Sequence, residues 1–300
     1  MSAVELIEKG AERTGLLEGG PLLAAARTDK GAVRKDNQDA FLCAIESGLF
    51  AVIDGMGGEK GGQRAAALAR EALLEEEEPV TGLARANEKV YETAVADPAL
   101  DGMGCVASAI RLVDGVAHIA HVGDTRVYLA GSAGCEQLTC DHTLAASLQE
   151  RLGLSYRGAK GLNGRNQVTR DIGGRARKDT AWIDRIEAPL EQGSLLLLCS
   201  DGLYDSIGAD DLFARLRQAQ RQGTPPDELV DQLIELALER KAKDNVTAVV
   251  VRQVGTVPHQ ERPAPLRAPS IRKEERLRLS LVPFLLGLAL GLALSGLLVP

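Results

Sequence analysis

Aspartates stand at the ends of apolar runs in five separate parts of this sequence, and this arrangement limits the folds that the chain can adopt. The five segments are Gly31–Asp39, Val52–Gly58, His121–Arg126, Leu198–Asp205 and Lys243–Thr247. Short apolar runs are typical of buried strands, so each carboxylate is expected near a strand end. Segments this far apart in sequence share one site only when the fold gathers several strand ends. We therefore predict a single carboxylate-rich metal site assembled by the fold.

The candidate ligands of this site are all oxygen donors. They are Asp39, Asp54, Asp124, Asp201, Asp205 and Asp244. Oxygen ligands without His or Cys suit Mg²⁺ or Mn²⁺. Two such ions about 3.5–4 Å apart can acidify a water and orient it for in-line attack. Gly55 can offer its carbonyl to a metal, and Arg34 can hold phosphate oxygens with two parallel N–H donors. An Asp-Gly pair alone is usually just a turn, but the combination indicates phosphate chemistry.

Composition narrows the class of protein. The chain has 300 residues, of which 45% are hydrophobic and only 3% aromatic, so the core is expected to be aliphatic. A net charge of −7 argues against a general nucleic-acid binder. The five cysteines lack CxxC spacing and the four histidines form no ligand pattern. We expect reduced, buried thiols in a cytosolic domain and histidines that are structural or exposed.

Periodicity and turn residues predict the elements of one large domain, residues 22–255. Predicted strands cover residues 22–28, 39–45, 49–53, 105–113, 116–122, 126–130, 194–200 and 246–254. Predicted helices cover residues 59–78, 81–96, 141–153, 209–222 and 225–240. The strands at 105–130 are expected to form a β-meander, with a hairpin turn at Asp114-Gly115. This order favours an α+β fold whose sheets carry helices on their outer faces.

The two ends of the chain differ from this domain. Residues 1–21 are interpreted as a leader, with a helical piece at 4–13, and they lack the apolar core of a signal peptide. Residues 256–278 form a proline-rich, basic linker. Residues 279–299 carry no charge and, as a helix, would span about 30 Å, which predicts a transmembrane helix.

The charges that flank this apolar stretch predict its orientation. The basic residues before it are Arg262, Arg267, Arg272, Lys273, Arg276 and Arg278. By the positive-inside rule they keep the large domain in the cytoplasm, as in a tail-anchored, single-pass protein of the cell membrane. Gly287 and Gly291 have the spacing of a helix-pairing motif and predict a weak dimer.

Eight blocks between residues 22 and 254 resemble, in order, the bacterial branch of the protein phosphatase 2C family of metal-dependent Ser/Thr phosphatases. They are Val33–Asp39, Asp54–Gly58, Gly102–Gly104, His121–Arg126, Asp141-His142, Thr169–Gly174, Ser200–Asp205 and Asp244–Thr247. The resemblance implies a four-layer α-β-β-α sandwich of two antiparallel sheets flanked by helix pairs. It also implies two Mn²⁺ or Mg²⁺ ions at one end of the sandwich, with a weaker third site.

The same resemblance implies a role for each candidate residue. Asp54 would bridge both metals, Gly55 would bind through its carbonyl, and Asp201 and Asp244 would hold the first metal. Asp39 would contact the second metal through water, and the third site would consist of Asp124, Asp205 and Asp201. Arg34 would bind the substrate phosphate, and a metal-bound water would attack phosphoserine or phosphothreonine. Residues 156–167 would form a flap beside the site.

Some residues depart from the family pattern. Met56 stands where eukaryotic members have a histidine proposed as general acid, so no general acid is assigned. Cys105-Val106 replaces the usual Thr-Thr and Thr125 replaces the usual Ser, and neither change removes a ligand. The expected partners are proteins phosphorylated on Ser or Thr, among them Ser/Thr kinases and their substrates, and no nucleic acid.

Three alternatives stay open at this point. In the first alternative, the chain is a catalytically silent phosphatase-like binding module. In the second, it is a metal phosphoesterase that acts on a nucleotide or another small phosphate. As a phosphatase, it could also act on phospho-residues of a sigma-factor antagonist instead of kinase substrates.

Overall fold

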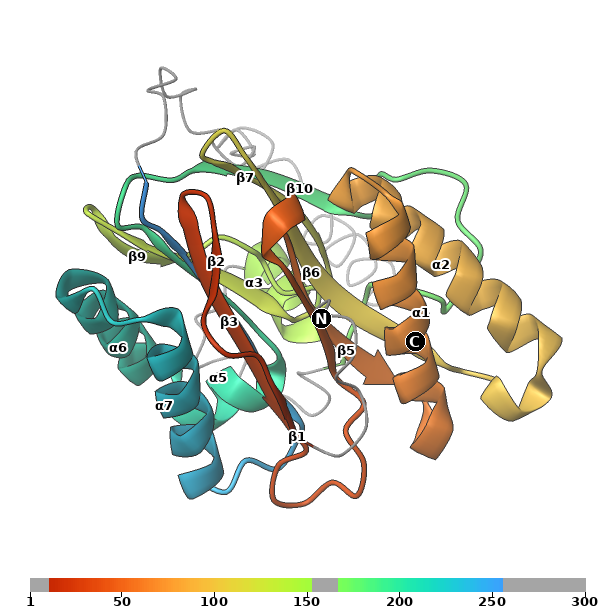
Figure 1. Cartoon of the computed structure of the whole chain (residues 1–300). Coiled ribbons are helices and arrows are strands. Elements are labelled where there is room, and N and C mark those ends of the chain that lie inside the picture. The colour runs from red at the N-terminus through yellow and green to blue at the C-terminus, as the bar shows by residue number, and fades with distance from the viewer. Residues whose placement is uncertain (1–10, 153–166, 256–300) are drawn as a thin grey trace, which may run out of the picture. The chain divides into compact units, whose positions relative to one another are not determined.

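Two antiparallel sheets face each other, and helices cover the outer face of each (Figure 1). This computed structural model describes residues 11–152 and 167–255, which belong to one compact unit, Met1–Pro258. The first sheet has the strand order β1-β3-β12-β11-β8-β9, and β2 also pairs with β3. Its strands are β1 (Ala11–Arg13), β2 (Leu17–Gly19), β3 (Leu22–Asp29), β8 (Arg126–Gly131), β9 (Gly134–Gln137), β11 (Leu195–Cys199) and β12 (Val246–Gln253).

The second sheet has the order β10-β7-β6-β5-β4. Its strands are β4 (Ala40–Ala44), β5 (Leu49–Met56), β6 (Gly104–Val113), β7 (Val116–Val122) and β10 (Asp184–Pro189). Asp114 and Gly115 both have positive φ angles of 48° and 75°, as the hairpin turn between β6 and β7 requires. Two short 3-10 helices, η1 (Ile45–Ser47) and η2 (Pro98–Leu100), connect other elements.

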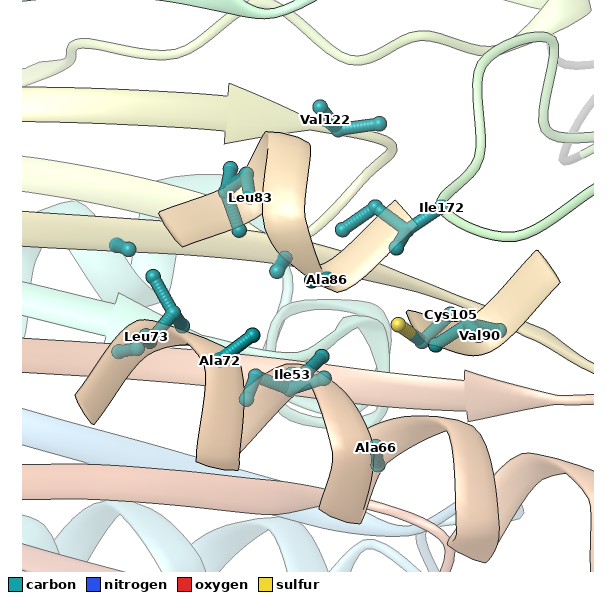
Figure 2. Packing of buried hydrophobic residues seen from close by; sticks show 14 of the residues in the cluster. Ile53, Ala66, Ala72, Leu73, Leu83, Ala86, Val90, Cys105, Val122 and Ile172 are labelled. Carbon is teal, nitrogen blue, oxygen red and sulfur yellow. The ribbon is translucent and has the colours of Figure 1, made fainter. Parts of the chain in front are cut away.

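Helices α1 (Gly58–Glu75) and α2 (Pro79–Ala96) pack on the second sheet. Figure 2 shows the contact layer, in which Ile53 of β5 and Cys105 of β6 lie against small and branched residues of both helices. Alanines such as Ala66, Ala72 and Ala86 line these helices, which lets the helix backbones approach the sheet closely.

Helices α5 (Asp201–Ile207), α6 (Ala209–Gln222) and α7 (Pro226–Glu239) pack on the first sheet. One further helix, α3 (Leu144–Leu152), follows β9. A third apolar layer fills the space between the sheets, with Val249 and Val251 of β12 facing Phe50 and Val52 of β5. Strand β12 is buried along its whole length because helices cover one face and the second sheet covers the other.

The structure confirms the predicted α+β class and most of the predicted helices and strands. It corrects the β-meander, because residues 126–131 leave β7 and join the other sheet as β8. The turn between them contains Gly123 at φ 103°, where a Cβ would lie 2.1 Å from the Val106 side chain. A hydrophobic alternation cannot report which sheet a strand joins, so this crossover had no sequence signal.

Three other expectations also need correction. Residues 11–19 of the predicted leader form β1 and β2, which pair with β3 instead of continuing a helix. Strands β9 and β10 and helix α5 were not predicted. The five cysteines are all free, but only Cys43, Cys105 and Cys199 are buried, whereas Cys140 is exposed.

Several predictions fall on residues that the structure leaves undescribed. These are residues 1–10, residues 156–166 of the predicted flap, and the predicted linker and transmembrane helix. Within the described ranges, no helix has both the length and the apolar character that crossing a membrane requires.

Candidate active site

One end of the sandwich gathers the strand ends that carry the predicted carboxylates. There β5, β7 and β11 finish, while β4, β8 and β12 begin, because each neighbouring pair is antiparallel. Asp54 is the third residue from the end of β5, and Asp39 directly precedes β4. The first sheet contributes Asp201 after β11 and Asp244 before β12. Both sheets therefore supply carboxylates to one place.

Asp39 is held by two hydroxyl groups from the opposite sheet. Ser200 Oγ and Thr247 Oγ1 donate to its Oδ2 at 2.7 and 2.6 Å. Thr28 Oγ1 lies 2.6 Å from Thr247 Oγ1, and the Thr247 N–H donates to Ser200 Oγ at 3.0 Å. Burial raises the pKa of Asp39 to about 6, although the two hydroxyl donors lower it. These hydroxyls fix one carboxylate oxygen and leave the other for a different partner.

The segment before Asp39 is fastened to the start of β12 by Asn245. The Asn245 side chain accepts from the Gln38 N–H at 2.9 Å and donates to the carbonyls of Lys30 and Asp36 at 3.0 Å each. Asn245 is buried, and all of these bonds join segments more than 200 residues apart in sequence. One asparagine thus sets the spacing between the Asp39 and Asp244 segments.

Asp54 and Asp201 are the most strongly perturbed carboxylates. Burial and the neighbouring aspartates raise the pKa of both well above the ordinary value, since each charge disfavours the next. Asp39 and Asp201 act on Asp54, and Asp124 and Asp244 act on Asp201. Asp201 Oδ1 is buried and has no hydrogen-bond partner among the described residues. A buried carboxylate oxygen without a donor is costly unless a cation binds it.

Asp124 lies in the link between β7 and β8. Its backbone carbonyl accepts from Tyr204 Oη at 3.0 Å, and the Tyr204 ring stacks under the Arg126 guanidinium at 3.5 Å. Arg126 donates two parallel bonds to Asp141, of 2.9 and 2.6 Å. Burial, together with the charges of Asp141 and Asp205, raises the pKa of Asp124 to about 7. Asp205 stands one turn after Asp201 on α5, so both project from the same helix face.

Arg34 contacts a predicted metal ligand. Its Nη2 donates to Asp244 Oδ2 at 2.6 Å, and that bond raises the pKa of Arg34. Asp54 and Asp201 also raise the pKa of Arg34, which places the guanidinium within the field of the carboxylate cluster. The Arg34 side chain as a whole is 55% exposed. In this state it partly neutralises the cluster.

Gly55 is enclosed by backbone on both sides. A Cβ at this position would lie 2.2 Å from the Gly62 carbonyl of α1 and 2.7 Å from the Gln38 carbonyl. Only glycine fits here, because α1 approaches the end of β5 closely. This packing accounts for the glycine itself, and its carbonyl as a metal ligand stays a prediction.

The carboxylates fit divalent cations without forming a closed cage. Within residues 11–152 and 167–255, no three acidic, His or Cys side chains already stand in a coordinating arrangement. The all-oxygen donor set and the partnerless Asp201 Oδ1 both suit Mg²⁺ or Mn²⁺.

Sequence reasoning missed the residues that position the carboxylates. They are Thr28, Ser200, Tyr204, Asn245 and Thr247. Ser200, Tyr204, Asn245 and Thr247 lie inside the predicted ligand segments, which gave them no role, so their place in the sequence was a usable signal. Thr28 is the second-last residue of β3, a strand without a predicted ligand, and only the fold brings it to the site.

Fold and site together define an α-β-β-α sandwich protein with aspartates of both sheets gathered at one end for cation binding. The chain belongs to the protein phosphatase 2C family, because the profile described as "Protein phosphatase 2C" matches residues 26–246.

Curated relatives carry related names. The Serine/threonine protein phosphatase PstP of Mycobacterium tuberculosis is 31% identical over 236 residues, which cover 75% of this chain and 44% of that protein. The Serine/threonine phosphatase stp of Listeria monocytogenes is 29% identical over 247 residues, covering 77% of this chain and 95% of that protein. The chain therefore spans less than half of the first relative and nearly all of the second.

Solved structures agree with this assignment. The Mycobacterium tuberculosis serine/threonine phosphatase PstP/Ppp superposes with a TM-score of 0.70 at 28% identity, covering 78% of this chain and 99% of that chain. The catalytic domain of PstP in complex with two manganese ions has a TM-score of 0.68 at 29% identity, covering 78% and 99% of the two chains.

Proposed function

We propose that this chain is a metal-dependent phosphatase that hydrolyses phosphoserine and phosphothreonine in proteins. The observation that carries the proposal is the convergence of aspartates from both sheets, which raise one another's pKa. Among the described residues, Asp201 Oδ1 has no hydrogen-bond partner. The relatives named as Ser/Thr phosphatases, and the related structure with two manganese ions, support it.

In this proposal Asp54, Gly55, Asp201 and Asp244 hold two Mn²⁺ or Mg²⁺ ions, with Asp39 acting through a water. Asp124, Asp205 and Asp201 hold a weaker third ion. When bound, the cations supply Lewis-acid activation of a water and neutralise phosphate charge. The chain itself keeps Asp39 ionised through Ser200 and Thr247 and orients the phosphate through Arg34.

Leaving-group protonation is not assigned to a side chain. Met56, the last residue of β5, cannot donate a proton, and His121 and His142 near the end of β7 are buried and bonded through Nε2 to the Cys140 carbonyl and to Asp184. Solvent is therefore the proposed proton source for the serine or threonine alkoxide.

The test measures hydrolysis and metal binding on the same full-length samples. Wild type, Asp54→Asn and Asp201→Asn are assayed on a phosphothreonine peptide with Mn²⁺, with Mg²⁺ and with EDTA, and Mn²⁺ binding is followed by calorimetry. Asp97→Asn is the matched control, because Asp97 is exposed and its side chain accepts from the Ala99 N–H of η2. We expect metal-dependent hydrolysis that both site variants reduce by about 100-fold or more.

The same assay separates the alternatives. Mn²⁺ binding without hydrolysis of any phosphoester would favour a silent binding module. Faster turnover of a nucleotide than of the phosphopeptide would favour a small-molecule phosphoesterase. Absence of Mn²⁺ binding in a folded wild type would refute the metal site itself.

We also propose that residues 279–299 anchor the chain in the cell membrane with the phosphatase domain in the cytoplasm. Their uncharged composition and the basic residues before them support this. Proteins ending at residue 258 and full-length proteins are compared by carbonate extraction of membranes. The full chain should stay in the membrane pellet and the shortened one should not, while both hydrolyse a small phosphopeptide equally. Extraction of both would contradict the anchor.

An anchor would concentrate the domain near membrane-bound substrates, so Ser/Thr kinases of the membrane and their substrates are the proposed partners. The Gly287–Gly291 spacing is proposed to support weak pairing of two anchors. Crosslinking in membranes should capture dimers of the wild type and fewer of a Gly287→Leu variant. Equal capture of both would argue against pairing through these glycines.

A further inference from the structure

Two buried histidines lie one on the other beside the carboxylate cluster. His121 is the second-last residue of β7, before the Asp124 link, and His142 lies two residues before α3. Their ring centroids are 4.8 Å apart, and the rings are tilted by 40°. His121 is fully buried and His142 is 6% exposed. Nothing in the proposed chemistry uses either imidazole, so their burial needs another explanation.

The hydrogen bonds of His142 define which nitrogen carries its proton. The Gly123 N–H can only donate, so His142 Nδ1, 3.0 Å away, is the acceptor and has no proton. Nε2 then carries the proton and donates to Asp184 Oδ2 at 3.1 Å. Arg170 Nη1 also lies 3.1 Å from this nitrogen, but its shorter bond, of 2.7 Å, goes to Asp184 Oδ1. The bond from His142 and the charge of Arg170 lower the pKa of Asp184 to about 2. The backbone N–H of His142 also donates to the Gly123 carbonyl at 2.7 Å. Gly123, the residue before Asp124, is thus held from both of its backbone polar groups.

His121 holds the residue after Asp124 through a serine. The Cys140 carbonyl can only accept, so His121 Nε2, at 3.1 Å, carries the proton, and Nδ1 accepts from Ser108 Oγ at 2.9 Å. Ser108 Oγ lies 2.8 Å from Thr125 Oγ1, which then donates to it, and 3.3 Å from the Thr125 carbonyl. Burial lowers the pKa of His121 to about 4, in keeping with a neutral ring.

The link needs such fastening because of where it lies. It leaves β7 in one sheet and enters β8 in the other, through a glycine with φ of 103°. Asp124 itself is tied through its carbonyl to Tyr204, which leaves its carboxylate to be aimed by the residues on either side. The charged groups around the histidine pair are Asp141, Arg170 and Asp184, and Arg170 Nη1 donates to Asp184 Oδ1 at 2.7 Å.

We propose that His121 and His142 are positioning residues that aim the Asp124 carboxylate at the third cation site by fixing Gly123 and Thr125. The inference rests on the proposed function, because Asp124 matters in this way only if the site binds cations. Groups that orient metal ligands typically change metal affinity by about 10- to 100-fold when removed.

The two polar ends of His142 can be separated by mutation. His142→Asn keeps an oxygen where Nδ1 accepts from Gly123 but loses the reach to Asp184. His142→Gln keeps a donor toward Asp184 but loses the acceptor for Gly123. His118→Gln is the matched control. His118 lies on β7, the strand of His121, but it faces outward, 3.3 Å from Glu187. Asp124→Asn marks which Mn²⁺ site is the third one.

Mn²⁺ is titrated into each metal-free, full-length protein, and free Mn²⁺ is followed by electron paramagnetic resonance. We expect Asp124→Asn to lose the weakest site and His142→Gln to weaken that site about tenfold, with the two tighter sites kept. His142→Asn should weaken it clearly less, and His118→Gln should match the wild type. Thermal unfolding of each protein reports whether it is folded.

Two results would overturn the inference alone: wild-type affinity at the weakest site in folded His142→Gln, or equal losses in both His142 variants. If His142→Gln does not fold, Ser108→Ala tests the other side of the link, and unchanged third-site affinity there overturns the inference. A wild type that binds no Mn²⁺ at all would instead overturn the proposed function, and this inference with it.

Discussion

At the scale of single residues, the site depends on hydroxyl groups as much as on carboxylates. Asp39 would be protonated more readily without Ser200 and Thr247, because burial alone raises its pKa and the two donors lower it. Thr247 also belongs to the buried pair with Thr28, so its hydroxyl is fixed in direction. The Thr247 hydroxyl of the first sheet therefore favours the ionised form of Asp39 beside the second sheet, which is the form that can bind a cation.

Thr247→Val should test this preparation. The change keeps the branched shape but removes the donor to Asp39, so the pKa of Asp39 should rise above about 6 and Mn²⁺ affinity near neutral pH should fall about tenfold. Calorimetric titration of Mn²⁺ measures the affinity. Thr169→Val, at an exposed threonine, controls for loss of a hydroxyl as such. Equal affinity of Thr247→Val and wild type would show that Ser200 alone is sufficient.

At the scale of elements, helix α5 sets the distance between the predicted ligands Asp201 and Asp244. It begins at Asp201 directly after β11, and its second residue, Gly202, lies against the backbone of Asn245. A Cβ on Gly202 would be 2.0 Å from the Asn245 carbonyl oxygen. The helix can therefore approach the Asp244 segment only because position 202 has no side chain.

Gly202→Ala should push α5 away from the start of β12. Because the clash is with backbone, we expect a loss of about 1–3 kcal/mol in the free energy of unfolding, together with weaker Mn²⁺ binding. Urea denaturation and Mn²⁺ titration measure the two effects. Gly131→Ala is the matched control, since its Cβ would meet only Ser194 Oγ at an ordinary 3.7 Å. A Gly202→Ala protein as stable as this control would contradict the packing argument.

Particular elements show what sequence patterns can and cannot predict. Apolar runs and the Asp-Gly and Pro signals predicted α6, α7, β11 and β12 almost to the residue, because each is long or fully buried. They missed α5, since its seven residues begin with Asp-Gly, which is typical of a turn. The predicted carboxylates do gather at one end, but the crossover of β8 and the contact of Arg34 with Asp244 depend on tertiary packing alone.

At the scale of the whole molecule, the metal-free protein carries an electrostatic cost that depends on pH. Asp39, Asp54, Asp124 and Asp201 have raised pKa values. Between the ordinary pKa of Asp, about 3.9, and those raised values, the folded state binds more protons than the unfolded state. The stability they contribute is therefore lost as pH rises through their folded pKa values. His121 acts in the opposite sense between its folded pKa of about 4 and the ordinary value near 6.5, but it is one group against four.

In EDTA, the midpoint of thermal unfolding should therefore fall between about pH 5.5 and about pH 7.5. With Mn²⁺ the stabilisation should grow over the same range, because cations compete with protons for these carboxylates. Scanning calorimetry in EDTA and in Mn²⁺ measures how the unfolding midpoint changes with pH in each condition. Asp54→Asn should flatten the EDTA profile, since one of the titrating groups is gone. An unfolding midpoint that rises with pH in EDTA would contradict the coupled carboxylates.

The contact between Arg34 and Asp244 has a consequence for the order in which ligands arrive. Asp244 Oδ2 accepts from Arg34 at 2.6 Å, so a cation that binds this oxygen competes with the guanidinium for it. Arg34 is then an internal competitor of the first cation, and cation loading releases it toward solvent. If the proposed function holds, phosphate binding should follow cation binding in a compulsory sequence, and phosphate should have little affinity for the metal-free chain.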